Sequence, residues 1–505
     1  MKRRDLLRTA LASPLAAAPA LGRGRRPGEA RRPDGEPMPN ILWICTDQQR
    51  YDTIEELNNP YIRTPNFRRL MAESTTFTHA FVQAPVCSPS RASFVTGRYP
   101  RTTGLRWNGQ RINPSERLVP RILAEYGYEC GLSGKLHLAP CHGGRVETRH
   151  RINDGYHQFW WSHDLQDAWP GENQWRNWLE REGVKWPDPP RDSRAWAVPI
   201  DRKYHQSAWC VDRAIDFMRQ QRSYGPWLMS VNIFQPHHPF WPVKEFMDRY
   251  DPEKLPPPSF QEGELETKPD YQRRQHTLGY GGRSFNETSE LDRRRITAAY
   301  YAMIEQSDFE IGRALDALDE SGQAENTIVI VTSDHGELLG DHGMYLKGPY
   351  FYDCSMRVPL MIRWPTRYRA GQRVDALVEM VDLAPTLLEA AGIAPEPQMQ
   401  GRPLTGILEG KTTTHRDSVY MEMYDSGSRA GGPAMVTAVR TETHKLVVYH
   451  SLDTGELYDL TKDPGEQRNL WSDPNSRDVR ERMLVKMTHR MAGTIDPLPP
   501  KNAPW

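Results

Sequence analysis

One stretch organises the interpretation of this chain: Val86-Cys87-Ser88-Pro89-Ser90-Arg91-Ala92, which continues to Phe94-Val95-Thr96-Gly97-Arg98-Tyr99-Pro100-Arg101. Its cysteine has no second thiol nearby, so neither a disulfide nor a metal knuckle is indicated. Arg91, four residues on, would favour a thiolate or any other anionic state at position 87. From these residues alone, Cys87 is either a reactive group or a buried structural cysteine, because free cysteine packs as a small hydrophobe.

The same stretch resembles the signature of the type I sulfatases, Cys-x-Pro-x-Arg followed by Thr-Gly-Arg. The signature positions are present here as Cys87, Pro89, Arg91, Thr96, Gly97 and Arg98. In that family a separate formylglycine-generating maturase oxidises the cysteine, and the hydrated aldehyde of the product is the nucleophile. The resemblance therefore implies that Cys87 is converted to formylglycine (3-oxoalanine) and that such a maturase is a partner.

The bulk composition narrows the class of protein. The 505 residues contain 65 Lys and Arg against 65 Asp and Glu, so the basic surplus typical of nucleic-acid binders is missing. With 15 Trp and 21 Tyr the chain reads as globular, although only 38% of it is hydrophobic. Six cysteines in a chain of this length do not predict a disulfide framework.

The N-terminus has the pattern of an export signal. Met1-Lys2-Arg3-Arg4 precedes an apolar stretch, 10–21, that ends in small residues. The paired arginines predict a twin-arginine signal peptide and lead-in over 1–30, hence the twin-arginine export machinery as a partner and a periplasmic or secreted bacterial protein. The alternative is an unstructured basic tail. No later segment has the ~18 consecutive apolar residues of a membrane helix, so we expect no span in the mature protein.

Two short apolar runs, Asn40–Thr46 and Thr327–Thr332, fit strands buried on both faces of a parallel sheet. Open α/β sheets place their sites at the carboxyl ends of such strands. The polar residues directly after these runs are Asp47 and Gln48, and Asp334 and His335.

The remaining pattern predicts alternating helices and strands. The predicted helices are Asn66–Glu73, Leu118–Tyr126, Tyr204–Arg219 and Leu291–Glu320, and the predicted strands are Tyr128–Ser133 and Trp227–Ile233. Eight tryptophans between Trp160 and Trp209 either pack a large insertion onto the core, the interpretation we favour, or line a cleft. Asp251–Leu291 is expected to be a long excursion without core strands.

Further motifs match the family in order. They are Gly134-Lys135-Leu136-His137, Gln235-Pro236-His237-His238-Pro239-Phe240, Gly340-Asp341-His342-Gly343 with Lys347, Arg357-Val358-Pro359-Leu360 and a helix over Leu377–Ala391. By resemblance, Lys135, His237 and Lys347 bind and neutralise the sulfate oxygens, and His237 or Lys347 protonates the leaving alcohol. His137 is the base that takes a proton as sulfate is eliminated, and Arg91 holds the nucleophile.

The resemblance also implies a divalent cation held by Asp47, Gln48, Asp334, His335 and modified Cys87. Many family members have an aspartate where this chain has Gln48, which removes a charge. Calcium prefers oxygen ligands whereas imidazole suits Mn²⁺ or Zn²⁺ better, so Ca²⁺ is expected first and Mn²⁺ or Zn²⁺ second. Asn108 is either a turn residue or, as in the related phosphonate monoester hydrolases, part of the substrate pocket.

The predicted fold is α/β and alkaline-phosphatase-like: a mixed, mostly parallel sheet flanked by helices, with a small C-terminal antiparallel α+β subdomain. The expected domains are a catalytic one over 38–400 and the subdomain over 401–505. Short β-like runs at Val436–Arg440, His444–Tyr449 and Glu456–Leu460, and a helix near Val479–Met491, belong to the second.

Hydrolysis of sulfate monoesters, of a sulfated small molecule or glycan, is the expected function. The nearest alternative is a phosphonate monoester or phosphodiester hydrolase of the same superfamily. A catalytically silent sulfated-glycan binder is disfavoured, because a lectin needs neither a base nor a convertible nucleophile. The motifs concern residues that would bind the sulfate group of the substrate. They do not indicate whether its alcohol part is a glycan, an aryl group or choline.

Overall fold

The computed structural model describes residues 31–497, except 142–150, 164–171, 191–193, 222–224, 425–430, 432–434, 451 and 453. The signal peptide expected over 1–30 lies outside the described residues and stays a prediction. Among the described residues, no helix combines the length and the apolar character that crossing a membrane would require.

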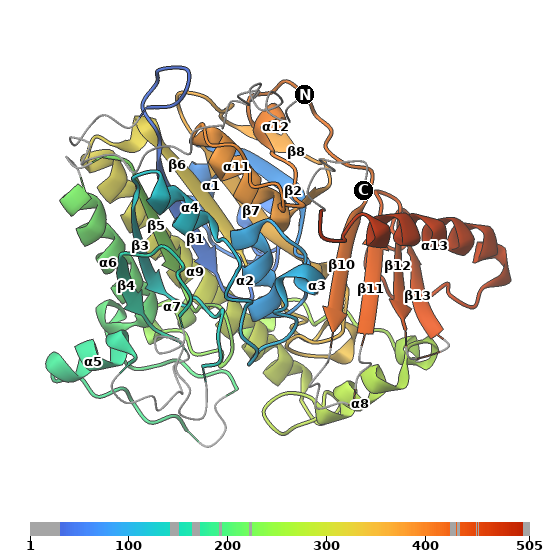
Figure 1. The fold of residues 1–505 in the computed structure, drawn as a ribbon. Coiled ribbons are helices and arrows are strands. Elements are labelled where there is room, and N and C mark those ends of the chain that lie inside the picture. Colours follow the sequence, from blue (N-terminus) through green and yellow to red (C-terminus); the bar gives the residue numbers. More distant parts are fainter. Residues whose placement is uncertain are drawn as a thin grey trace, which may run out of the picture.

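A mixed nine-stranded sheet forms the centre of the larger part of the molecule (Figure 1). Its order is β4-β3-β5-β1-β6-β7-β2-β8, with β9 beside β2, and only β7 runs antiparallel to its neighbours. The strands are β1 (Asn40–Thr46), β2 (Thr75–Phe81), β3 (Glu129–Gly134), β4 (Gln158–Trp161), β5 (Trp227–Asn232), β6 (Thr327–Ser333), β7 (Arg357–Arg363), β8 (Gln372–Val374) and β9 (Val378–Glu379). The α/β prediction is confirmed.

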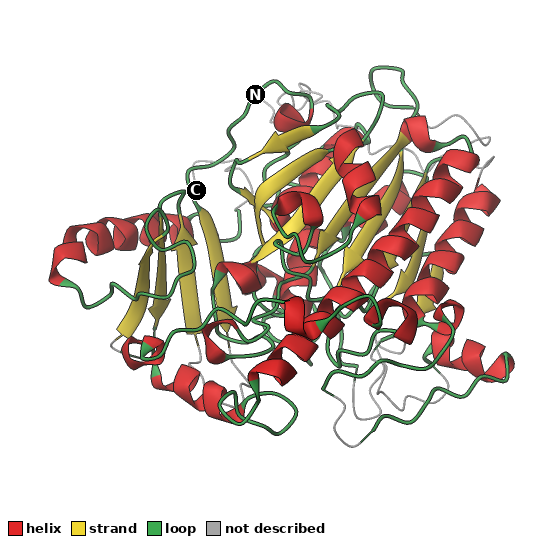
Figure 2. Ribbon diagram, turned by 180° about the vertical axis from the view of Figure 1, so that it is seen from behind, coloured by secondary structure: helices red, strands yellow, loops and turns green. Residues whose placement is uncertain are grey.

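Helices cover both faces of this sheet because its central strands are apolar on both sides. Along β1, Leu42 and Ile44 join the core under one set of helices, whereas Ile41 and Trp43 join the core under the other. Figure 2 shows the long helices that cross the face turned away from the viewer in Figure 1. The first set contains α1 (Pro65–Glu73), α6 (Gln206–Gln220) and α9 (Glu290–Glu320), and the second α2 (Cys87–Thr96), α4 (Val119–Glu125) and α11 (Leu383–Ala390).

A separate antiparallel sheet, β10-β11-β12-β13, lies beside the main one (Figure 1). Its strands are β10 (Val419–Tyr424), β11 (Met435–Arg440), β12 (His444–Tyr449) and β13 (Thr454–Asp459). Helix α13 (Arg477–Ala492) packs on one face of this sheet through Met483 and Met487. Three of these strands and the helix were predicted, whereas β10 was not. The domain limits 38–400 and 401–505 stay predictions.

The connecting segments contain short elements. They are α3 (Pro100–Thr103), α5 (Gln174–Arg181), α7 (Lys244–Met247), α8 (Asp270–Leu278), α10 (Asp353–Met356), α12 (Thr405–Leu408) and the 3₁₀ turns η1 (Glu55–Leu57), η3 (Arg202–Tyr204), η5 (Pro252–Lys254), η6 (Glu264–Thr267), η7 (Ala324–Asn326), η8 (Asp341–Gly343), η9 (Met380–Asp382) and η10 (Pro474–Ser476).

Two of these segments differ in part from what the sequence predicts. The helix expected over Leu377–Ala391 begins only at Leu383, because Val378–Glu379 pairs with β2 and a 3₁₀ turn follows. The segment Asp251–Leu291 carries no strand, as expected, but it does contain α8.

The described tryptophans of the insertion support the packing interpretation. Trp175 and Trp209 are buried in the core beneath α6 and α9, and Trp161 is buried at the end of β4.

Candidate functional site

The site forms where parallel strands end side by side. Thr46 at the end of β1 pairs with Ser333 at the end of β6, so Asp47 and Asp334 follow at the same edge of the sheet. Arg91 from α2 lies between the two carboxylates: its Nη2 is 3.0 Å from Oδ2 of Asp47 and its Nε is 2.8 Å from Oδ2 of Asp334. All three side chains are fully buried, which makes this pairing the centre of the site.

Cys87 is the first residue of α2, and its buried thiol faces this edge of the sheet. Val86 is extended and Pro89 occupies the first turn, where a missing N–H costs nothing, so the helix begins at the cysteine. The sulfur lies 3.1 Å from Nε2 of His335, 3.0 Å from Nζ of Lys347 and 3.8 Å from Oδ1 of Asp47.

Positive charge dominates the surroundings of Cys87. Burial by itself would raise the pKa of the thiol, but Lys135, Lys347 and His335 together bring that pKa well below its usual value. The same charges, at a helix N-terminus, would favour an anionic group of a substrate. The site therefore suits a negatively charged ester.

Lys135 and Asp47 form a buried ion pair behind the cysteine, with Nζ 2.6 Å from Oδ2. Although burial opposes both charges, the pair with Asp47 raises the pKa of Lys135, and Lys135, His237 and Arg91 hold the pKa of Asp47 well below its usual range. Burial, together with the charge of Lys135, lowers the pKa of His137 to about 4. His137 is therefore neutral near pH 7 and interacts with the Cys87 side chain.

Four donors suited to a divalent cation converge here: one atom each from Asp47, Cys87, Asp334 and His335, all within 4.8 Å of one another. Nδ1 of His335 donates to the carbonyl of Gly336 at 2.8 Å, which leaves the Nε2 lone pair facing the cluster. Metal-ligating histidines are oriented in this way. The donor set therefore fits a divalent cation.

Gln48 is positioned by both ends of its side chain. Its amide nitrogen donates to Oε2 of Glu337, and its amide oxygen accepts from Nζ of Lys347 at 2.7 Å. Glu337, fully buried, also accepts the backbone N–H groups of Leu339 and Leu346. The sequence analysis missed this role of Glu337, although its place three residues after Asp334 was a usable signal.

His237 reaches the site from the loop after β5. Its ring packs on Phe234, with centroids 4.5 Å apart, and stacks on His238 at 4.1 Å. The imidazole also interacts electrostatically with the carboxylate of Asp47. The sequence analysis assigned nothing to His238, which lines the adjoining pocket.

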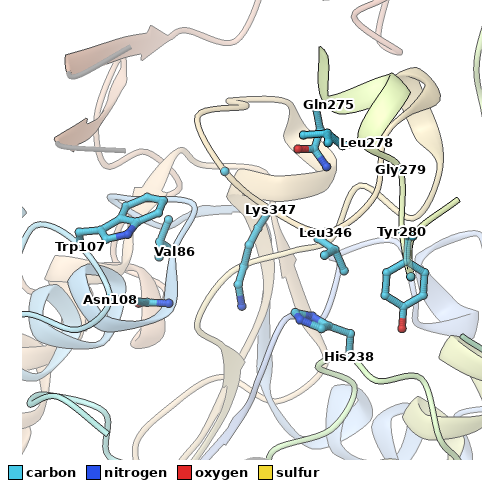
Figure 3. A pocket seen from close by; sticks show the side chains of 13 residues that line it. Val86, Trp107, Asn108, His238, Gln275, Leu278, Gly279, Tyr280, Leu346 and Lys347 are labelled. Carbon is cyan, nitrogen blue, oxygen red and sulfur yellow. The ribbon is translucent and has the colours of Figure 1, made fainter. Parts of the chain in front are cut away.

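A cavity of about 490 Å³ opens beside Lys347 and Val86, the residue that precedes Cys87 (Figure 3). Lys347 reaches into it between two walls, with Trp107 and Asn108 on one side and Leu278 and Tyr280 on the other. Asn108 accepts the N–H of Ser88 at 2.9 Å, so it holds the start of α2 as well as lining the pocket. The wall from α8 and the loop after it was not predicted. The other lining residues are Val86, His238, Gln275, Gly279, Gly281, Gly282, Leu346 and Gly348.

The second half of the signature lies outside this cluster. Gly97 ends α2 with φ 70°, and a Cβ there would come 3.2 Å from Ala384 and Met399. Arg98 pairs with Glu116 at 3.1 Å and with Asp496. Thr-Gly-Arg therefore ends the helix and ties it to the C-terminal region.

The structure thus brings the predicted site residues into one region. Cys87, Arg91, Lys135, Asp47, Gln48, Asp334, His335 and Lys347 share direct contacts, His137 and His237 join them through their interactions with Cys87 and Asp47, and Asn108 lies at the pocket wall. Their individual roles stay predictions.

Comparison with known proteins places these features in context. The sulfatase family profile matches residues 39–393, and a profile for the C-terminal part of N-sulphoglucosamine sulphohydrolase matches 340–492. An arylsulfatase of Clostridium perfringens is 30% identical over 88% of this chain and 92% of its own length. A choline-sulfatase of Rhizobium meliloti is 30% identical over 86% and 83%. The solved structure of a phosphonate monoester hydrolase from Agrobacterium radiobacter is 26% identical, with a TM-score of 0.79 over 91% of this chain and 96% of that one.

Proposed function

Because this chain belongs to the sulfatase family and is a sulfuric ester hydrolase, we propose that it releases inorganic sulfate from sulfate monoesters by means of a formylglycine derived from Cys87 and a divalent cation. The observation that carries the proposal is the setting of Cys87. It is buried at a helix N-terminus with Lys347 and His335 within 3.1 Å, and Lys347 in turn lines an open pocket.

Each side chain has a task that follows from its position. Lys135 and Lys347 provide charge for the sulfate oxygens, since both act on the position of Cys87. His137, neutral because its pKa is about 4, can accept a proton there. His237, or Lys347 at the pocket, would deliver a proton to the leaving alcohol. Hydrated formylglycine supplies a hydroxyl that attacks sulfur and a second one whose deprotonation expels the sulfate.

Asp47, Gln48, Asp334 and His335, with the modified residue 87, would hold the cation. Bound there, it would act as a Lewis acid that polarises oxygen and screens negative charge. The two aspartates and the amide oxygen favour Ca²⁺ as the first choice, while the His335 imidazole leaves Mn²⁺ or Zn²⁺ as the second. Arg91, bound to both carboxylates, keeps them in place with or without the cation.

The deciding experiment is mass spectrometry of the peptide that carries Cys87, from protein produced with a formylglycine-generating enzyme. We expect an aldehyde that reacts with hydrazide, and turnover of an aryl sulfate by the same preparation. A protein that keeps an unmodified thiol yet hydrolyses the sulfate would refute the proposed nucleophile. A modified protein that releases no sulfate from any ester would refute the proposed reaction.

Phosphonate monoester or phosphodiester hydrolysis is the second candidate. The structural likeness to a phosphonate monoester hydrolase supports it, and the set Asp47, Gln48, Asp334 and His335 fits it as well as it fits a sulfatase. The ratio of kcat/KM for matched aryl sulfate and aryl phosphonate esters separates the two. We expect sulfate to be preferred, and a ratio that favours the phosphonate would reverse the assignment.

Export by the twin-arginine route, to the periplasm or beyond the cell, is part of the proposal. That route carries folded proteins, so Cys87 could be modified before export. N-terminal sequencing of protein from the periplasmic fraction tests it, with Arg3→Lys and Arg4→Lys together as the matched variant. Mature protein that reaches the periplasm equally well from both would exclude the twin-arginine route.

A further inference from the structure

A second group of potential metal ligands lies beside the site. It consists of His137, Cys141 and His163, each of which offers one ligand atom within 4.8 Å of the others. The three side chains are buried, between 6% and 9% exposed. Neither Cys141 nor His163 was singled out from the sequence.

The sheet explains why these residues meet. Strands β3 and β4 are parallel neighbours, with Gly134 opposite Trp161, and the N–H of Ser162 continues the pairing to the carbonyl of Gly134 at 3.1 Å. Residues that follow the two strands therefore leave the same edge side by side. His137 and Cys141 follow β3, and His163 follows β4 two residues after its last residue.

The distances suit a tetrahedral ion. A sulfur and a nitrogen bound to one zinc ion at about 2.3 and 2.0–2.1 Å lie about 3.5 Å apart, and Sγ of Cys141 lies 3.4 Å from Nε2 of His163. The rings of His137 and His163 meet edge to face with centroids 4.9 Å apart, and His163 stacks on Trp161. The two imidazoles are therefore held against the thiol by packing.

We propose that His137, Cys141 and His163 form a second divalent-metal site, selective for Zn²⁺ and similar soft ions. A thiolate and two imidazoles are poor ligands for Ca²⁺ but good ones for Zn²⁺. We therefore expect Ca²⁺ to prefer the oxygen-rich first site and Zn²⁺ to prefer the second. On binding, the Cys141 thiol loses its proton to solvent and the sulfur takes the ion. Three protein ligands leave a fourth position for water.

Occupancy of this site would inhibit the enzyme. A metal ion on His137 takes the lone pair of one ring nitrogen, and the other nitrogen keeps its hydrogen, so the imidazole no longer accepts a proton. This consequence rests on the proposed role of His137 as base, whereas metal binding itself does not. Zn²⁺ would thus act as a reversible inhibitor without displacing the catalytic cation.

Binding is tested in the Cys87→Ala protein with Ca²⁺ present, because that variant lacks the thiol of the first site. We expect one Zn²⁺ per chain by isothermal titration, release of a proton, and a thiolate charge-transfer band when Co²⁺ replaces Zn²⁺. Adding Cys141→Ala should weaken Zn²⁺ at least ~10-fold and abolish the band. Adding Cys130→Ala, a buried cysteine on β3 outside the group, should change neither.

The proposal would be overturned if Zn²⁺ bound equally with and without Cys141, or if no Zn²⁺ bound beyond the first site. The contact between Cys141 and His163 would then be only a thiol–imidazole hydrogen bond. Inhibition is measured separately with modified, active enzyme. Zn²⁺ should lower kcat in the parent protein but not in Cys141→Ala, whose activity without Zn²⁺ should match the parent. If Cys141-dependent binding leaves kcat unchanged, the metal site holds, and it is the role of His137 in the proposed function that fails.

Discussion

The ammonium nitrogen of Lys347 lies 3.0 Å from the sulfur of Cys87, a residue 260 positions earlier in the chain. Lys347 comes from the loop after β6 and lines the cavity, whereas Cys87 starts α2, directly after Val86 at the cavity wall. Lys347 therefore connects the predicted metal ligands with the substrate pocket. Its Nζ donates to the amide oxygen of Gln48 at 2.7 Å, and its side chain lines the pocket. A sulfate group bound at residue 87 would therefore lie within reach of the Lys347 ammonium group.

Replacing Lys347 by alanine should lower kcat/KM for an aryl sulfate by roughly 10²–10³-fold, because one donor to the developing negative charge is lost. Steady-state kinetics on modified, metal-loaded protein measures this. Lys411→Ala, at an exposed surface lysine, is the matched control and should leave kcat/KM unchanged. Equal kcat/KM for the two variants would show that Lys347 takes no part in the reaction.

Glu337 should control metal affinity through Gln48. Its Oε1 accepts two backbone N–H groups and its Oε2 accepts the Gln48 amide nitrogen, which aims the Gln48 oxygen at the site. In Glu337→Gln, an NH₂ group would face that nitrogen, so Gln48 must either flip or lose its partner. We expect metal affinity to fall about 10–100-fold, as for other residues that orient ligands. Competition with a chelator measures this, and unchanged affinity would mean that Gln48 is not a ligand.

The pH profile should identify the base. The pKa of His137 is lowered to about 4, first by burial and then by the charge of Lys135. A base works only when neutral, so activity should persist well below pH 6 and be lost as the pH falls through about 4. The measurement is kcat between pH 3.5 and 8. His137→Ala should remove this limb and lower kcat about 10²–10⁴-fold. An acidic limb that stays in the variant belongs to another group.

Much of the site could be predicted because its residues follow buried strands. Apolar runs such as Asn40–Thr46 mark parallel strands, and parallel strands end at one edge, so Asp47 and Asp334 were expected at that edge. The pairing of β1 with β6 then makes them neighbours. The family signature then marked Cys87 itself, which the structure places at the start of α2.

The pocket wall could not be predicted for a physical reason. Leu278 and Tyr280 come from a segment rich in proline, glycine and charge, whose few apolar residues follow no helix or strand period, and apolar contacts with a substrate need no fixed spacing. The grouping of His163 with His137 depends on the pairing of β4 with β3, which the loose sequence around β4 does not specify. Strand β10 was also missed.

A buried lysine joins the two sheets. Lys445 on β12 is fully buried, and its Nζ pairs with the carboxylate of Asp353 in α10 and lies 2.5 Å from Oε1 of Glu466. It also donates to the carbonyl of Phe351 at 3.0 Å. Since α10, which Asp353 begins, directly precedes β7 of the main sheet, the contact fixes the C-terminal sheet against the larger part of the molecule.

Lys445→Met should therefore lower the free energy of unfolding by about 3–5 kcal/mol, because it leaves buried carboxylates uncompensated. Although burial opposes it, Lys445 and two arginines lower the pKa of Asp353, so this carboxylate stabilises the fold above its unfolded pKa of about 3.9 and loses the contribution as the pH falls through its folded value. The difference between parent and variant should thus be largest near neutral pH and shrink on acidification. Urea denaturation at several pH values measures this difference.

The matched control is Lys462→Met, at an exposed lysine paired with Asp459, which should lower the free energy of unfolding by less than about 1 kcal/mol. A Lys445 variant as stable as this control would show that the two sheets are held by apolar packing instead.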